Sequence, residues 1–85
     1  MKKLSFYEDK NGIYNQLRAA RIAKGMSQSE LAAKMQTMNV NIDQQMISKI
    51  ENNNRIVTDY ELACLSIILG VSERELLCDV YNKYN

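Results

Sequence analysis

The 85-residue sequence contains no histidine, no proline, three glycines and only two cysteines. Without histidine a mixed cysteine–histidine zinc site is excluded, and two cysteines are too few for a four-thiolate site. Cys64 and Cys78 both lie in helical patterns, and we interpret them as reduced thiols packed as small apolar groups. The lack of proline and scarcity of glycine favour helices joined by short turns.

Long apolar runs are also missing. No stretch approaches the roughly 18 apolar residues of a membrane span. The start Met1-Lys2-Lys3 is basic, but no apolar region follows it, so no signal peptide is predicted. A chain of this length allows one domain with a small core. We therefore expect a single-domain cytoplasmic protein without a membrane partner.

The side chains that an enzyme needs are absent too. There is no histidine, no Gly-rich phosphate loop and no pair of carboxylates at a plausible pocket. No serine or tyrosine has a neighbouring group that could activate it. We expect neither catalysis nor a cofactor, and the protein should act by binding.

Positive charge is concentrated near the beginning of the chain. Residues 1–28 contain six Lys/Arg and two Asp/Glu, residues 29–55 contain three of each, and residues 56–85 contain two and five. The first segment is therefore basic and the last acidic, although the formal net charge is only +1. We expect one face of the protein to meet phosphate and the other not to. The alternative is that this uneven charge distribution arises by chance in a short chain.

Apolar periodicity and capping signals predict an all-α fold of five helices with no strand. Residues 1–12 show no clear period and are predicted to form a partly ordered arm before a domain over residues 13–85. The predicted helices cover about 13–24, 28–38, 44–52, 59–69 and a last one from 73 onwards. Three capping boxes support three of these starts: Ser27 with Glu30, Thr58 with Glu61, and Ser72 with Glu75.

The helix predicted from residue 44 has two different sides. Asp43 is a good N-cap, and Met46, Ile47 and Ile50 form one apolar strip. The polar residues Gln44, Gln45, Ser48 and Lys49 fall outside that strip. Glutamine can donate and accept on one base edge, and lysine can bond guanine or a phosphate. We predict a DNA recognition helix; a polar surface facing only solvent is the alternative.

Four motifs in order resemble the Cro/repressor-type helix-turn-helix domains, also called the XRE family. They are L-R-x-x-R at 17–21, G-M-S-Q-S-E-L-A at 25–32, I-S-K-I-E-N at 47–52 and L-G-V-S at 69–72. The resemblance covers about residues 13–77. It implies a lambda-repressor-like bundle of five helices, with the second and third forming the helix-turn-helix, and it implies binding to double-stranded DNA.

The resemblance also implies roles for individual residues. Gln44, Gln45 and Lys49 match positions that face bases. Positions near phosphate are matched by Gln28, Asn52 and Arg55. Arg21 and Glu51 match a structural ion pair that links the first helix to the third.

The turn before the recognition helix departs from the family pattern. Fourteen residues, 33–46, separate two motif pairs that about eight usually separate, so the turn is lengthened. Asn41 stands where the family has a glycine at the start of the turn, and Asn53 stands where a glycine usually follows Glu51. Asn53 is expected to adopt the left-handed conformation, which asparagine tolerates better than most residues. This difference in turn length leaves open the orientation of the predicted recognition helix.

The end of the chain carries an apolar stripe wider than one small core needs. We predict a dimer interface at Leu77, Val80, Tyr81 and Tyr84; closure of the domain core is the alternative use of the stripe. The predicted function is a sequence-specific, repressor-like transcriptional regulator that binds DNA as a homodimer. An antitoxin bound to a toxin protein, or another interaction module of the same fold, is the second hypothesis.

Overall fold

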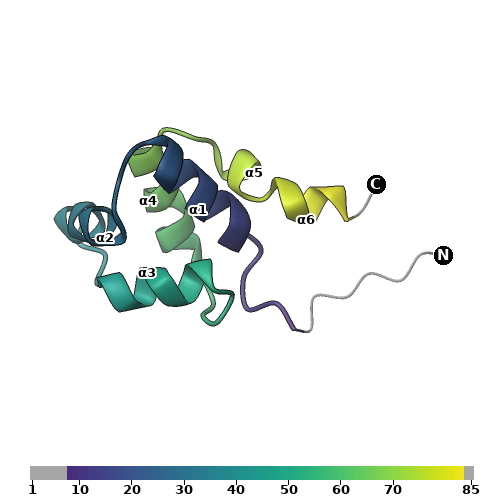
Figure 1. Ribbon diagram of the computed structural model, residues 1–85, viewed down its shortest axis with the longest axis horizontal. Helices are drawn as coiled ribbons and strands as arrows, with labels where there is room; N and C mark the ends of the chain where they lie inside the picture. The colour runs from purple at the N-terminus through teal and green to yellow at the C-terminus, as the bar shows by residue number, and fades with distance from the viewer. Residues whose placement is uncertain (1–7, 84–85) are drawn as a thin grey trace.

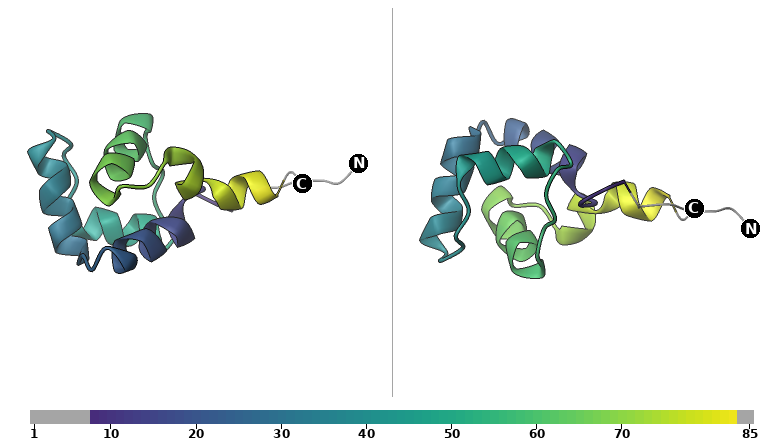
Figure 2. Two further views of the ribbon diagram at one scale, coloured as in Figure 1. Left: turned by 90° about the horizontal axis from the view of Figure 1, so that it is seen from above. Right: turned by 90° about the horizontal axis from the view of Figure 1, so that it is seen from below.

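A computed structural model describes residues 8–83, and this part of the chain is all-helical (Figure 1). Most of the predicted arm, residues 1–7, and Tyr84 of the predicted dimer interface lie outside the described residues. The helices are α1 Tyr14–Ala23, α2 Gln28–Thr37, α3 Gln44–Glu51, α4 Asp59–Leu69, α5 Glu73–Leu76 and α6 Cys78–Asn82. α2 closes one end of the bundle, and α5 and α6 lie at the other end (Figures 1 and 2).

The helices begin where the sequence predicts them to begin. The hydroxyls of Ser27, Thr58 and Ser72 each accept a hydrogen bond from the backbone N–H three residues later, and the glutamate there bonds back. All three predicted capping boxes are confirmed. The carboxylate of Asp43 accepts from the Met46 N–H at 2.8 Å and caps α3 in the same way.

Four helices end in a left-handed residue, one of which is Gly70 after α4 with φ of 68°. Gly25, Asn39 and Asn53 have φ of 69°, 62° and 60° after α1, α2 and α3. In each case the N–H of this residue and the next return to carbonyls of the last turn, for example Asn39 to Gln36 and Val40 to Met35. The left-handed conformation predicted for Asn53 is confirmed. The alignment of Asn41 with the glycine of the turn is wrong, because Asn39 adopts that conformation.

The lengthened turn is folded onto the core. α2 reaches Thr37, with Met38 as its C-cap, and residues 38–43 connect it to α3. Ile42 is fully buried, and the Gln36 side chain donates to its carbonyl at 2.9 Å. The connection between the two helices is therefore short in the structure, and Ile42 anchors the chain immediately before α3.

The core consists of side chains from all of the first five helices and from this turn. Its fully buried members are Ile13, Leu17, Leu31, Met35, Ile42, Ile47, Ile50, Leu65 and Leu76. α3 contributes two of them and lies against both α1 and α2, so its inner face is fixed by apolar contacts.

The prediction of one continuous last helix is wrong. α5 and α6 are separate short helices that meet at Leu77, so there are six helices among residues 8–83. Leu77 packs against the core, and Val80 lies so close to Gly12 that a Cβ there would stand 2.4 Å from a Val80 methyl group. A single straight helix is interrupted because the chain turns to pack these apolar side chains against its own domain.

The segment before α1 is bound to the end of α3 by two asparagines. The Asn11 amide nitrogen donates to the carbonyls of Ile50 and Arg55, at 3.0 Å each, and the Asn11 side-chain oxygen accepts from the Ile13 N–H. The Asn53 side-chain oxygen accepts from the backbone N–H groups of residues 10 and 11. We call this arrangement the asparagine clasp; it adds a second donor to the Ile50 carbonyl, which also accepts from the Asn53 N–H, and supplies a donor to the Arg55 carbonyl.

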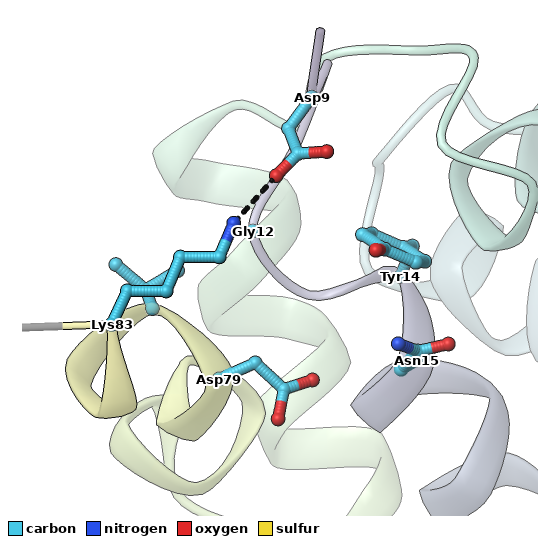
Figure 3. A pocket seen from close by; sticks show the side chains of 7 residues that line it. Asp9, Gly12, Tyr14, Asn15, Asp79 and Lys83 are labelled. Atoms are coloured by element: carbon cyan, nitrogen blue, oxygen red, sulfur yellow. Dashed lines mark hydrogen bonds and ion pairs between the residues drawn. The ribbon is translucent and has the colours of Figure 1, made fainter. Parts of the chain in front are cut away.

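Asp9 extends the clasp to the last helix. It accepts from the Asn53 amide at 2.8 Å and from the Lys83 ammonium at 3.0 Å (Figure 3). The hydrogen bonds from Lys83 and Asn53 lower the pKa of Asp9. Residues 9–11, the end of α3 and the end of α6 are thus joined through polar side chains.

The clasp predicts a measurable loss of stability when Asn11 is shortened. In Asn11→Ala the Arg55 carbonyl loses its side-chain donor and the Ile50 carbonyl keeps only the Asn53 N–H, at a cost of about 1–3 kcal/mol. Urea unfolding of this variant should be compared with Asn15→Ala, which changes an exposed asparagine of α1. Equal midpoints for the two variants would show that the clasp contributes nothing.

Candidate DNA-binding interface

α3 presents one continuous polar face to solvent. Gln44, Gln45, Lys49 and Asn52 are exposed, Ser48 between them is half-buried, and the opposite side of the helix is buried. α3 lies at the lower edge of the molecule in Figure 1, with no other described helix beneath it. The three residues predicted to face bases therefore share one accessible surface.

The side chain of Gln44 is held by α2. The Ser29 hydroxyl lies 3.1 Å from the Gln44 side-chain oxygen and donates to it. This contact joins the first turn of α2 to the first turn of α3 across the lengthened turn. It leaves the amide N–H groups of Gln44 to act as donors, which are the groups that meet an acceptor such as adenine N7.

A two-bond ion pair fixes α3 from behind. The Arg21 guanidinium donates from Nε to Glu51 Oε2 at 2.6 Å and from Nη2 to Glu51 Oε1 at 2.9 Å, and a third N–H donates to the Met26 carbonyl. Only 12% of the Arg21 side chain and 3% of the Glu51 side chain are exposed. The hydrogen bonds that Arg21 donates to Glu51 raise the pKa of Arg21. This pair connects α1, the α1–α2 turn and α3.

Gln28 belongs to the same network. Its amide nitrogen donates to Glu51 Oε1 at 3.1 Å, and the side chain is half-buried. The residue predicted to contact phosphate thus supports the ion pair in the free protein. The other predicted phosphate contact on α3, Asn52, is exposed and its amide lies 3.4 Å from the Ser48 hydroxyl.

Arg55 also forms an internal ion pair. It donates to both oxygens of Glu61, at 2.8 and 2.9 Å, and to the Ile56 carbonyl. Burial of Glu61 acts to raise its pKa, but the hydrogen bonds from Arg55 and Thr58 outweigh burial and lower it. Arg55 therefore connects the segment after α3 to the start of α4.

Sequence reasoning missed several side chains that position α3. From the sequence, Ser29 could be placed only in the first turn of the second predicted helix. Asn11 could be placed only in the predicted arm. Glu61 was assigned to a capping box, which it forms, but its pairing with Arg55 had no sequence signal. Each is polar and lies next to a helix end, which is the feature that could have identified it.

The three described residues of the predicted dimer interface, Leu77, Val80 and Tyr81, do not share one exposed surface. Leu77 packs against the core and Val80 lies against Gly12. Tyr81 is 42% exposed, with the Arg74 guanidinium over its ring at 4.3 Å. Much of the C-terminal apolar stripe thus packs against other residues of the same chain.

Fold and surface together define a helix-turn-helix DNA-binding domain, with α2 and α3 as its two helices. A family model described as helix-turn-helix matches residues 17–76. The chain belongs to this Cro/repressor-type, or XRE, family of DNA-binding domains. Searches of curated proteins and of solved structures found no significant match. None of the helices described between residues 8 and 83 is long and apolar enough to cross a membrane.

The Arg21–Glu51 pair predicts non-additive effects on stability. Glu51→Ala should cost about 3–5 kcal/mol because it leaves a largely buried guanidinium without its partner. The double variant Arg21→Met/Glu51→Leu should recover much of this loss, since no charge is then buried alone. Urea unfolding measures the stability of these variants and of the single variants Arg21→Met and Glu51→Leu. A double variant that loses as much stability as those two single variants together would contradict the pairing.

The Glu61 pKa predicts a specific pH dependence. Because the folded-state pKa is lowered, the ionised carboxylate adds stability above the unfolded pKa of about 4.3. That contribution disappears as the pH falls through the lower folded-state pKa. Glu61→Gln should therefore be less stable than the parent at pH 7, and the difference should shrink between pH 5 and pH 3. A difference that is constant with pH in urea titrations would contradict this account.

Proposed function

We propose that this protein is a cytoplasmic, sequence-specific transcriptional regulator of the repressor type that binds double-stranded DNA as a homodimer. Each protomer inserts α3 into the major groove, and the two half-sites lie about one helical turn, roughly 34 Å, apart. The observation that carries the proposal is the exposed polar face of α3, held rigidly by the Arg21–Glu51 pair within a domain of this family.

Gln44, Gln45 and Lys49 are proposed to read bases. Glutamine pairs with adenine in two-bond geometry, so A·T pairs are expected among the bases that α3 reads. Ser29 fixes the orientation of Gln44 by donating to its side-chain oxygen, whereas Gln45 and Lys49 lie exposed beside it. Base recognition at the Gln44 position should consequently be the most selective of the three.

Backbone contacts set the register of the domain on DNA. We propose that Asn52, exposed at the end of α3, contacts phosphate directly. Gln28 and Arg55 contribute mainly by positioning, because their side chains already bond Glu51 and Glu61. Lys10, exposed next to the asparagine clasp, adds a positive charge near the same end of α3.

A second candidate is an interaction module of the same fold, such as an antitoxin that binds a toxin protein. The observation that favours it is the set of large apolar side chains exposed around α4, including Ile56, Tyr60 and Ile67. Antitoxins of this fold can also bind DNA, so the two candidates differ in the partner of that apolar surface and not in the use of α3.

Replacement of the glutamines tests base recognition. Selection from random duplexes with the purified protein should yield a two-fold symmetric motif that contains A·T pairs. Gln44→Ala or Gln45→Ala should weaken binding to that motif by about 1–3 kcal/mol and relax selectivity at one base pair per half-site. Ser29→Ala should relax selectivity at the Gln44 position alone. Lys34→Ala, which removes an exposed lysine of α2, is the matched control. Equal weakening on all sequences would refute base reading by α3.

A further inference from the structure

α4 is apolar on both of its sides. Its inner side carries buried residues such as Leu65 and Leu69, yet Tyr60 is 78% and Ile67 is 67% exposed on its outer side. In both views of Figure 2, α4 lies at an edge of the bundle, away from α3. A helix that is apolar on all sides normally lies buried. The exposed outer side of α4 therefore indicates a surface that another molecule covers.

The exposed residues form one face with a large–small–large order. Tyr60 and Ile67 are seven residues apart and project in nearly the same direction from a helix with 3.6 residues per turn. The half-buried Ala63 and Cys64 lie between them. We call Tyr60, Ala63, Cys64 and Ile67 the α4 face. Ile56, 66% exposed in the segment that leads into α4, extends its apolar surface.

We propose that the α4 face packs antiparallel against the α4 face of a second copy of this chain. The midpoint of the face falls between Ala63 and Cys64. A two-fold axis at that point sets Tyr60 of each copy against Ile67 of the other and brings the small residues together where the helices approach most closely. This inference deepens the proposed function, on which it rests for its expectation of a two-fold partner.

Charge supports a second copy in this orientation. Asp59 lies at the N-terminal end of α4, and the Lys24 ammonium lies next to Gly70 at its C-terminal end, 3.4 Å from where a Cβ would stand. Antiparallel packing brings Asp59 of one copy toward Lys24 of the other and also places the two helix dipoles in opposite directions. No residue of α4 is basic, so the face is unsuited to DNA.

The available area fits a weak dimer. A tyrosine-sized side chain buries on the order of 150–250 Å² when fully enclosed, so the three two-thirds-exposed side chains of each copy supply roughly 600–900 Å² in total. Stable interfaces begin at about 1,200 Å². We expect association of the free protein in the micromolar range.

A charge exchange across the axis tests the arrangement. Tyr60→Lys and Ile67→Glu should each be monomeric in sedimentation equilibrium at about 100 μM, because each places two charges against apolar side chains. An equimolar mixture of the two variants should associate again, since lysine of one then faces glutamate of the other while the second Tyr60–Ile67 contact is kept. Circular dichroism verifies that each variant is folded. Ile22→Lys, at an exposed isoleucine of α1, should leave association unchanged.

A short bismaleimide provides an independent measure. In Cys78→Ser it should join two copies through Cys64 near the axis, and in Cys64→Ser the yield should fall to background. The inference is overturned if the parent is monomeric at 100 μM, if the mixed variants stay monomeric, or if Tyr81→Lys abolishes association while Tyr60→Lys does not. The last result would place the dimer at the C-terminal stripe. Binding of each variant to a half-site duplex reports on DNA recognition separately, so the proposed function can fail while the dimer stands, and the reverse.

Discussion

The bond between Arg21 and Glu51 is the constraint on which the position of the recognition helix depends. It joins α1 to the last turn of α3, takes in the Met26 carbonyl of the α1–α2 turn, and accepts support from Gln28 of α2. A buried ion pair adds little net stability, because desolvation offsets most of the attraction. Its contribution here is geometric: two parallel hydrogen bonds hold the last turn of α3 against α1, in addition to the apolar contacts of its inner face.

The remaining fixed points lie at the two ends of α3. At its start, the buried Ile42 and the Asp43 cap set where the helix begins. At its end, the asparagine clasp donates to the carbonyls of Ile50 and Arg55, and Arg55 connects the following segment to α4. A helix of eight residues is too short to be stable by itself. Its order must come from these surrounding contacts. For this reason many polar side chains that do not belong to the exposed face of α3 affect its orientation.

Local rules were sufficient to predict most of the fold. The three capping boxes, the left-handed Asn53 and the extent of α3 follow from neighbouring residues, and the structure confirms them. Failures occurred where distant residues decide the conformation. The last helix breaks because Val80 packs against Gly12, some 68 positions earlier in the sequence. In the candidate site the sequence could place Gln44 on an outer face, but not Ser29 against it, since that contact depends on how the lengthened turn folds.

Two arginines are committed to carboxylates, Arg21 to Glu51 behind α3 and Arg55 to Glu61 at the start of α4. Cations held in this way release few counterions from DNA, so the sequence-independent part of the affinity should be small. Under the proposed function, binding then draws more heavily on base contacts from α3 and on the pairing of two protomers. Because the α4 face offers only a small area, the proposed dimer is weak in the absence of DNA, and simultaneous contact with two correctly spaced half-sites adds affinity that either contact lacks. In this proposal both properties favour the specific site over other DNA.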